Sequence, residues 1–123
     1  MKVIVDTSVW SLALGRSAVQ KNKYVEELGE LIKEARVLLL GRIRQEVLRQ
    51  HLRAFRDLEI GREDYEMASA YFNKARINGI RGSNTDFSIC AISTRLIVPI
   101  FSTDKDFLNF QSILPIELHT VRP

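Results

Sequence analysis

The chain has 123 residues, of which 46% are hydrophobic and 27% charged, and a formal net charge of +3. This length and composition indicate one folded domain spanning 1–123 and exclude an intrinsically disordered chain. A net charge this small does not by itself indicate a nucleic-acid partner.

The cellular compartment follows from the cysteine content and the apolar runs. Cys90 is the one cysteine, and its apolar setting FSICAIS predicts a buried, unreactive thiol with no internal disulfide. No stretch approaches the ~20 apolar residues of a membrane span, and Asp6 breaks the N-terminal apolar run too early for a signal peptide. We therefore expect a cytoplasmic protein with no membrane contact.

Apolar runs of strand length alternate along the chain with segments of helical periodicity. Strands are predicted at 2–5, 37–40, 98–101 and 116–119. Helices are predicted at 6–14, 19–35, 42–58, 63–77, 84–96 and 104–110. Strands that alternate with helices predict an α/β fold with one parallel sheet covered by helices on both faces.

The helix predicted at 42–58 carries a stripe of arginines opposite its apolar face. Four arginines lie within about 60° of one another on this helix: Arg42, Arg49, Arg53 and Arg56. Glu46 lies at the edge of the stripe, and one interpretation is a solvated face in which it pairs with Arg42 and Arg49. The alternative is a groove in which the arginines bind phosphates beside a metal ion held partly by Glu46.

Four acidic residues follow predicted strand ends or begin predicted helices. They are Asp6, Glu46, Asp86 and Asp104. In an open parallel sheet these positions converge at the carboxyl ends of the strands, where ligands bind. We therefore expect the four carboxylates to face one pocket.

Each acid also has an explanation as a helix cap, and taken singly that explanation is the stronger one. The candidate caps are Asp6, the capping boxes Ser83–Asp86 and Thr103–Asp106, and Asp104 at the positive end of a helix dipole. The case for a functional site rests on the four positions occurring together.

Electrostatics predicts what would fill such a pocket. Two carboxylates ~4 Å apart repel by roughly 4 kcal/mol at an effective dielectric of 20, so the group must share protons or bind a cation. Oxygen ligands favour Mg²⁺ or Mn²⁺, and zinc is disfavoured because neither His51 nor His119 has a ligand-spaced partner. Hard dications suit phosphoryl chemistry, in which they polarise the phosphate and activate a bound water.

Four segments of this sequence resemble the motifs of PIN-domain ribonucleases, and among these the VapC-type toxins of toxin–antitoxin pairs. The segments are VIVDTSVW, RIRQEVL, NTDFSICAIS and IFSTDKDF, in the family's order and approximate spacing. The resemblance implies a PIN-like three-layer sandwich with a central, mostly parallel sheet. It also implies a Mg²⁺- or Mn²⁺-dependent endoribonuclease, a homodimer, and inhibition by a cognate antitoxin.

The resemblance assigns roles to individual residues of this chain. The acidic ligands would be Asp6, Glu46, Asp86 and Asp104, with Asp106 as an additional acid and Ser8 and Ser102 as supporting polar residues. A water activated by the metal would attack an RNA phosphodiester that the arginine stripe guides. The choice of RNA over DNA comes from the resemblance alone.

Two other functions are compatible with the same residues. A haloacid-dehalogenase-like phosphatase also begins with a strand that ends in Asp, but it needs a second Asp two residues later, where this chain has Ser8. A PIN-like domain that binds RNA or protein without catalysis would keep the same fold and acids.

Overall fold

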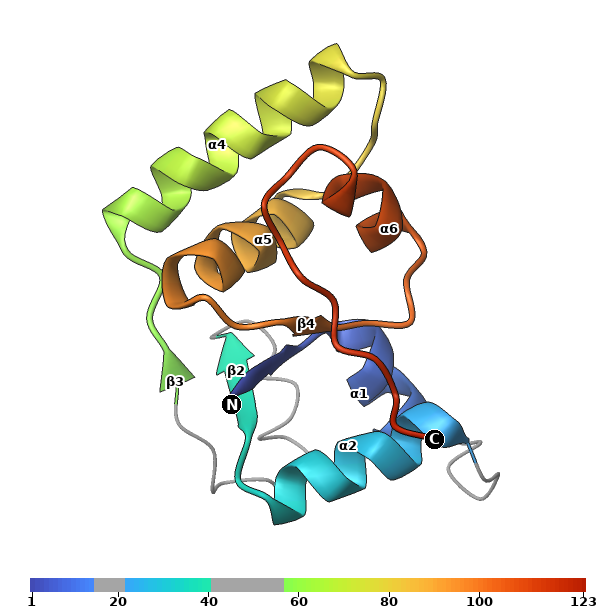
Figure 1. Cartoon of the computed structure of the whole chain (residues 1–123). Helices are drawn as coiled ribbons and strands as arrows, with labels where there is room; N and C mark the ends of the chain where they lie inside the picture. The colour runs from blue at the N-terminus through green and yellow to red at the C-terminus, as the bar shows by residue number, and fades with distance from the viewer. Residues whose placement is uncertain (15–21, 41–56) are drawn as a thin grey trace.

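The computed structural model describes residues 1–14, 22–40 and 57–123, and its elements are shown in Figure 1. In chain order they are β1 (Val3–Val5), α1 (Thr7–Leu14), α2 (Lys23–Lys33), β2 (Val37–Leu40), β3 (Asp57–Leu58), α4 (Arg62–Ile77), α5 (Asn84–Leu96), β4 (Ile100–Phe101) and α6 (Asp106–Gln111). None of the helices within these ranges is long and apolar enough to cross a lipid bilayer.

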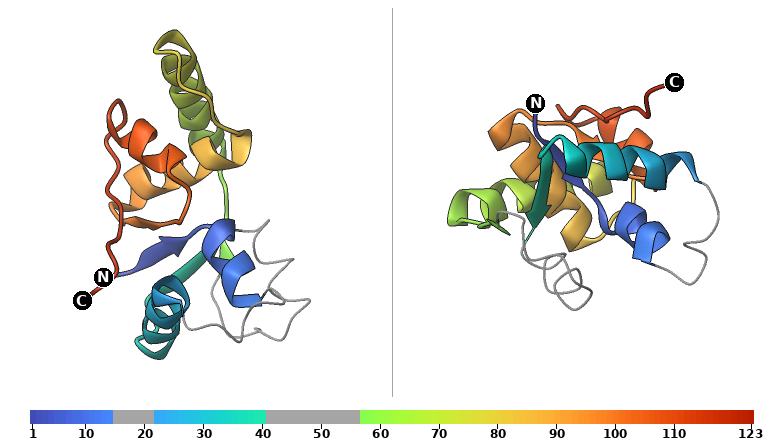
Figure 2. Two further views of the ribbon diagram at one scale, coloured as in Figure 1. Left: turned by 90° about the vertical axis from the view of Figure 1, so that its right-hand side faces the viewer. Right: turned by 90° about the horizontal axis from the view of Figure 1, so that it is seen from below.

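A parallel sheet forms the centre of the molecule. Its strand order is β3-β2-β1-β4, and neighbouring strands pair in parallel, with Ile4 opposite both Leu38 and Ile100. Helices α1 and α2 lie on one face, while α4, α5 and α6 lie on the other (Figures 1 and 2). The fold is therefore an α/β sandwich with a central parallel sheet and helices on both faces (Figure 1), as predicted.

The central strand is apolar because both of its faces are covered. Val3, Ile4 and Val5 are all fully buried, as expected for a parallel strand between two helical layers. The strand leads directly into Asp6, which starts α1, so the first acidic side chain stands at the carboxyl edge of the sheet.

Several predicted elements agree with the structure, and others need correction. The helix predicted at 19–35 is α2, which begins at Lys23 and ends at Lys33, and the strand predicted at 98–101 is reduced to Ile100–Phe101. The strand at 37–40 and the helix at 84–96 have the predicted bounds. The helix predicted at 42–58 is wrong at its end, because residues 57–58 form β3 and Asp57 pairs with Leu39; its other residues lie outside the described ranges. The strand predicted at 116–119 is reduced to a single bridge between Leu118 and Ile100. Elements this short carry too few residues to show a period of two.

A buried ion pair joins α4 to α5. Asp64 accepts hydrogen bonds from Arg95 Nε at 2.7 Å and Nη2 at 3.1 Å, and from the Gly61 N–H at 3.0 Å. Burial raises the pKa of Asp64, but the bonds from Arg95 and Gly61 outweigh it and leave the pKa below its ordinary 3.8. The pair fixes the start of α4 against the last turn of α5.

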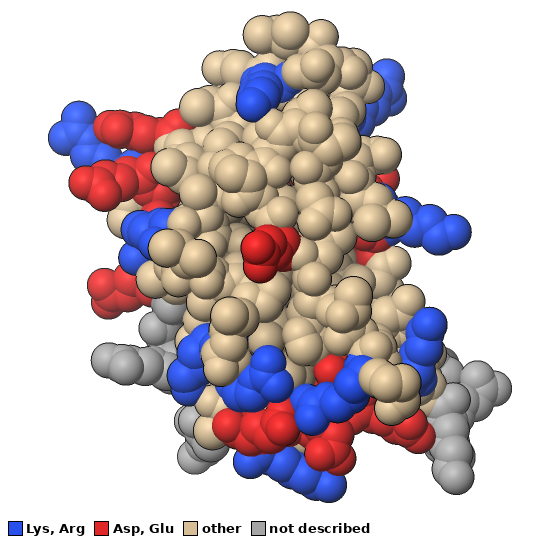
Figure 3. Space-filling view, in the orientation of Figure 1, with Lys and Arg blue, Asp and Glu red and all other residues tan. Residues whose placement is uncertain are grey.

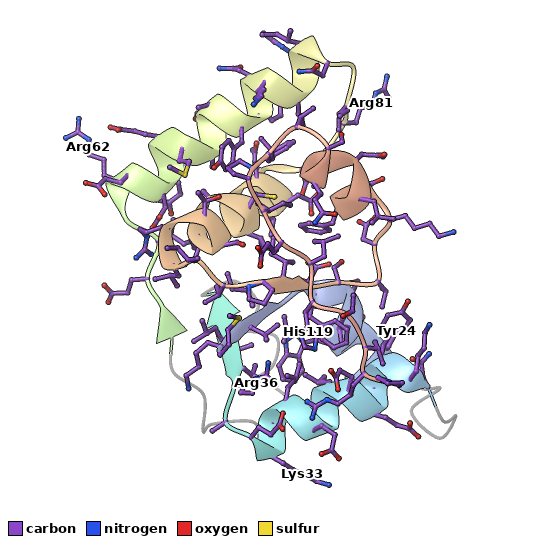
Figure 4. The ribbon with its side chains drawn as sticks, in the orientation of Figure 1. Tyr24, Lys33, Arg36, Arg62, Arg81 and His119 are labelled. Atoms are coloured by element: carbon purple, nitrogen blue, oxygen red, sulfur yellow. The ribbon has the colours of Figure 1, made fainter. Side chains whose placement is uncertain are left out.

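A second ionic cluster joins the C-terminal segment to α2. The buried Glu27 carboxylate binds His119 Nε2 and Arg122 Nε, each at 2.7 Å, while Arg122 Nη2 also binds Glu34 at 2.6 Å. The Arg122 hydrogen bond lowers the pKa of Glu34 to about 2. His119 lies between β4 and α2 (Figure 4), and charges of both signs crowd the lower edge of the same face (Figure 3). This cluster holds the last residues of the chain on the α2 side of the sheet.

We expect Arg95→Ala to lower the free energy of unfolding by about 2 kcal/mol in urea titrations at pH 7. Removing one partner of a fully buried pair costs about 3–5 kcal/mol, and the 39% exposure of the Arg95 side chain reduces this. Because the pKa of Asp64 is lowered, the contribution of the pair is complete above pH 3.8 and is lost as the pH falls through the folded-state pKa.

Arg62→Ala is the matched control, because Arg62 makes an exposed pair with Glu66 on the same helix. Such pairs contribute about 0.2–1 kcal/mol at most. Equal destabilisation by the two substitutions at pH 7 would contradict the role given to the Asp64–Arg95 pair.

Candidate active site at the carboxyl end of the sheet

Asp6 is held at the end of the central strand by hydroxyl groups. Its side chain is buried, with 7% of the residue exposed, and Oδ2 accepts hydrogen bonds from Ser8 Oγ and Ser102 Oγ, each at 2.8 Å. Its backbone N–H donates to the Phe101 carbonyl at 2.9 Å. The structure therefore brings Ser8 and Ser102 against Asp6, from the segments that follow the neighbouring strands β1 and β4.

The segment after β4 orients both hydroxyls. The Thr103 N–H donates to Ser8 Oγ and the Asp104 N–H donates to Ser102 Oγ, each at 3.0 Å. Because each hydroxyl accepts a backbone N–H, its own proton is directed to Asp6 Oδ2. The sequence predicted a capping role for Thr103 and did not predict that its backbone N–H orients Ser8. Every residue except proline has a backbone N–H, so the residue type gives no indication of this contact.

Asp104 also caps the short helix that follows it. Its Oδ1 accepts a hydrogen bond from the Asp106 N–H at 2.9 Å. The capping box predicted between Thr103 and Asp106 does not form, because α6 has no side-chain hydrogen bond at its N-cap, Lys105. The predicted helix start moves from Asp104 to Asp106, and both carboxylates are exposed.

Asp86 forms the predicted capping box with Ser83 at the start of α5. Its Oδ2 accepts from the Ser83 N–H at 2.9 Å, and its own N–H donates to Ser83 Oγ at 3.1 Å. Burial raises the pKa of Asp86, and the negative charges of Asp6 and Asp104 raise it further, against the opposing hydrogen bonds from Ser83. The charges of Asp6 and Asp104 therefore reach Asp86, although the three residues come from distant parts of the chain.

Gly82 fixes the path by which the chain enters α5. A Cβ at this position would lie 2.6 Å from Cζ of Phe110 and 2.8 Å from Cζ of Phe87. Two buried aromatic rings thus press against the backbone directly before Ser83, and only glycine fits there. This close approach sets where the first turn of α5, and with it Asp86, meets the edge of the sheet.

The cap and ligand explanations of the acids turn out to be compatible. One oxygen of each carboxylate holds local structure: Oδ2 of Asp6, Oδ2 of Asp86 and Oδ1 of Asp104. Within the described residues no hydrogen bond reaches the second oxygen of any of the three. Each acid therefore retains one oxygen for a ligand.

The donor set suits a hard cation, but it is incomplete among the residues described. Carboxylate oxygens are the ligands that Mg²⁺ and Mn²⁺ prefer, and their mutual repulsion favours a dication. Across 1–14, 22–40 and 57–123, no three acidic, histidine or cysteine side chains gather closely enough to hold one ion. The predicted fourth ligand, Glu46, lies outside the described residues, as do Arg42, Arg49, Arg53 and Arg56.

Cys90 lies one helical turn after Asp86 in α5 and is not one of the site residues. It is fully buried in α5, and burial, followed by the charges of Asp86 and Asp6, raises its pKa to about 12. A thiol in this state is not a nucleophile at neutral pH, in agreement with the predicted inert cysteine.

Comparisons with known proteins identify the fold. No family model matches the chain, and no curated protein sequence matches it. The structure is similar to that of FitAcB from Neisseria gonorrhoeae, with a TM-score of 0.72, 18% identity, and coverage of 96% of both chains. It is also similar to VapBC2 from Rickettsia felis bound to a DNA fragment from its promoter, with a TM-score of 0.73, 12% identity, and coverage of 97% and 98%.

These findings correct the assignment drawn from the four sequence motifs. Membership of the VapC-type PIN ribonucleases does not hold, because identities of 18% and 12% establish a shared fold and no family model supports more. The physical reason lies in the motifs, three of which place an acid near a strand end or helix start, while the motif with Glu46 lies outside the described residues. Such positions follow from the fold, so the motifs predicted the fold correctly and the family wrongly.

We expect Asp86→Asn to raise the free energy of unfolding at pH 7 in the presence of EDTA. The pKa of Asp86 is raised, so ionisation costs more in the folded state than in the unfolded chain. Asparagine removes the charge and keeps an oxygen to accept the Ser83 N–H. The gain should vanish as the pH falls through the raised pKa, because the wild-type carboxyl then also becomes neutral.

Thermal unfolding followed by circular dichroism measures this effect, with Glu117→Gln as the control. Glu117 is an exposed carboxylate beside the start of β4, and its neutralisation should leave the stability unchanged. A loss of stability in Asp86→Asn at pH 7 would mean that the ionised carboxylate does not destabilise the folded state, which contradicts the raised pKa of Asp86.

Proposed function

We propose that the protein is a Mg²⁺- or Mn²⁺-dependent endoribonuclease that hydrolyses RNA phosphodiesters and acts as the toxin of a toxin–antitoxin pair. The observation that carries the proposal is the placement of Asp6, Asp86 and Asp104 at the carboxyl edge of the sheet, close enough for the charges of Asp6 and Asp104 to raise the pKa of Asp86. Each of these acids has one oxygen held by the protein and a second that meets no donor within the described ranges.

The chain's own residues have distinct parts in this proposal. Asp6, Asp86 and Asp104 would hold the cation, with Glu46 and Asp106 completing its ligands. A bound dication supplies charge neutralisation at the phosphate and lowers the pKa of water. Ser8 and Ser102 fix the orientation of Asp6 so that its second oxygen stays directed at the site.

Fold comparison supports the partner more directly than it supports the reaction. The chain matches the whole length of the FitAcB and VapBC2 chains, and the VapBC2 structure contains promoter DNA. We propose a cognate antitoxin as the protein partner, a homodimeric active form, and an RNA path along Arg42, Arg49, Arg53 and Arg56.

A non-catalytic RNA- or protein-binding module is the second candidate. It is favoured by the finding that no three potential ligands gather around one point among the described residues. An aspartyl-phosphate mechanism is disfavoured, because the residue two positions after Asp6 is Ser8 and its hydroxyl donates to Asp6 Oδ2.

We expect Asp6→Asn to reduce cleavage of a single-stranded RNA by about 100-fold or more, because metal charge stabilisation accounts for several kcal/mol. The measurement is gel analysis of a 5′-labelled RNA with Mg²⁺ or Mn²⁺, with EDTA, and after metal is restored. A single-stranded DNA of the same sequence is run in parallel to decide the substrate class.

Ser11→Ala serves as the control, because Ser11 is an exposed residue of α1 outside the site. It should cleave at the wild-type rate. Cleavage by Asp6→Asn at that same rate, or wild-type cleavage that persists in EDTA, would overturn the nuclease. Metal binding by calorimetry with no cleavage of either nucleic acid would favour the non-catalytic module.

A further inference from the structure

A pocket between α4 and α5 lies beside the N-terminus of α5, the helix that also carries Asp86 of the candidate active site. Its volume is about 420 Å³, and its lining comes from α4, the residue Ile60 before it, and the first turns of α5. Asn84, Thr85 and Ser88 line the pocket, while Asp86 stands between them in the sequence. Side chains two apart on a helix do not face each other, so this turn presents Asp86 to the acids and its neighbours to the pocket.

Aromatic rings form the apolar part of the pocket. Tyr65 and Phe72 of α4 line it and are exposed, at 58% and 38%. Phe72 meets the buried ring of Phe87 edge-on, with centroids 5.7 Å apart and an interplanar angle of 84°. This contact fixes the Phe72 ring, so that a flat ligand has a preformed surface on which to stack.

Amide and hydroxyl groups form the polar part. The side chains of Asn73 and Asn84 line the pocket and make no hydrogen bond to any residue in the described parts of the chain. Each amide offers both donors and an acceptor, which is the combination that pairs with the edge of a nucleobase. Ser88 Oγ donates to the Asn84 carbonyl at 2.9 Å and keeps its lone pairs for a donor from the ligand.

The part of the pocket lining that the structure describes carries no charge, and this favours some occupants over others. None of the described lining residues is Asp, Glu, Lys or Arg. A phosphate or a charged peptide side chain would lose its hydration there without gaining a counter-charge. The occupant that matches is flat, neutral and rich in hydrogen-bonding edges.

We propose that this pocket binds a nucleobase of the single-stranded RNA substrate, an inference that rests on the proposed function. The base belongs to a nucleotide flanking the cleaved phosphate, since the acids and the pocket lie on different sides of the α5 N-terminus. RNA crossing that terminus would place a phosphate at Asp86 and a base against Phe72. The pocket thereby selects unpaired RNA, because a stacked and paired base cannot enter it.

The test measures binding in EDTA, so that it does not depend on cleavage. A fluorescein-labelled single-stranded RNA and a series with one abasic nucleotide at each position are titrated by anisotropy against the wild type, Phe72→Ala, Asn73→Ala and Met67→Ala. Base–aromatic stacking contributes about 1–3 kcal/mol, so Phe72→Ala should weaken binding about 10-fold. Asn73→Ala should weaken it by less and change the preference between bases.

Met67→Ala is the matched control, because Met67 lies on the same helix with 36% exposure, against 38% for Phe72, and does not line the pocket. It should bind RNA as the wild type does. An abasic nucleotide at one position should weaken RNA binding by the wild type about as much as Phe72→Ala does. The same abasic RNA should bind Phe72→Ala no more weakly than the intact RNA does.

Three results would overturn the proposal that the pocket binds a nucleobase. They are equal affinity of Phe72→Ala and Met67→Ala, equal affinity for every abasic RNA, and a change in sedimentation of Phe72→Ala from dimer to monomer with unchanged RNA affinity. The last would assign the pocket to a second copy of the chain. If Phe72→Ala weakens RNA binding but the wild type does not cleave RNA in Mg²⁺, the nuclease proposal alone is overturned. If the wild type cleaves RNA but Phe72→Ala binds it normally, the base-binding pocket alone is overturned.

Discussion

One carboxylate oxygen joins the ends of two neighbouring strands, and the rest of the site is arranged around it. Oδ2 of Asp6 receives the hydroxyl protons of Ser8 and Ser102, from the segments that follow β1 and β4. A buried carboxylate needs such donors, because an unpaired charge in this position would cost several kcal/mol, roughly the desolvation penalty of one ion. The backbone amides of Thr103 and Asp104 complete the arrangement, so the loop after β4 cannot shift without releasing Asp6.

The other two acids are also held by one oxygen each. Asp86 and Asp104 each use one oxygen to begin a helix, and Asp86 experiences the negative charge of both its neighbours. The folded chain therefore keeps three like charges in mutual range and holds them there with short, local hydrogen bonds. Strain of this kind is typical of functional sites, where stability is traded for a prepared set of ligands.

The sequence predicted the layers of the fold and the positions of Asp6 and Asp104 after two strands, because strand and helix periods and the residues after each strand are local signals. It failed at β3 and at 116–119, where elements of one or two residues depend on pairing with distant strands. It missed the backbone donor of Thr103, and it did not anticipate that Glu27 and Asp64 are buried with arginine partners. Both carboxylates stand at core spacing from apolar residues of their helices, a signal that was available. Family membership was predicted wrongly, since motifs set by the fold do not distinguish families within it.

The sealed thiol of Cys90 gives this protein a built-in reporter. It is the one cysteine of the chain, it lies fully within the core of α5, and its pKa is raised to about 12. A maleimide or disulfide reagent can reach it only when α5 separates from the sheet, so the rate of labelling counts openings of the core. Any cation or partner that tightens the sheet edge would slow that chemistry, so the labelling rate of the purified protein reports its binding.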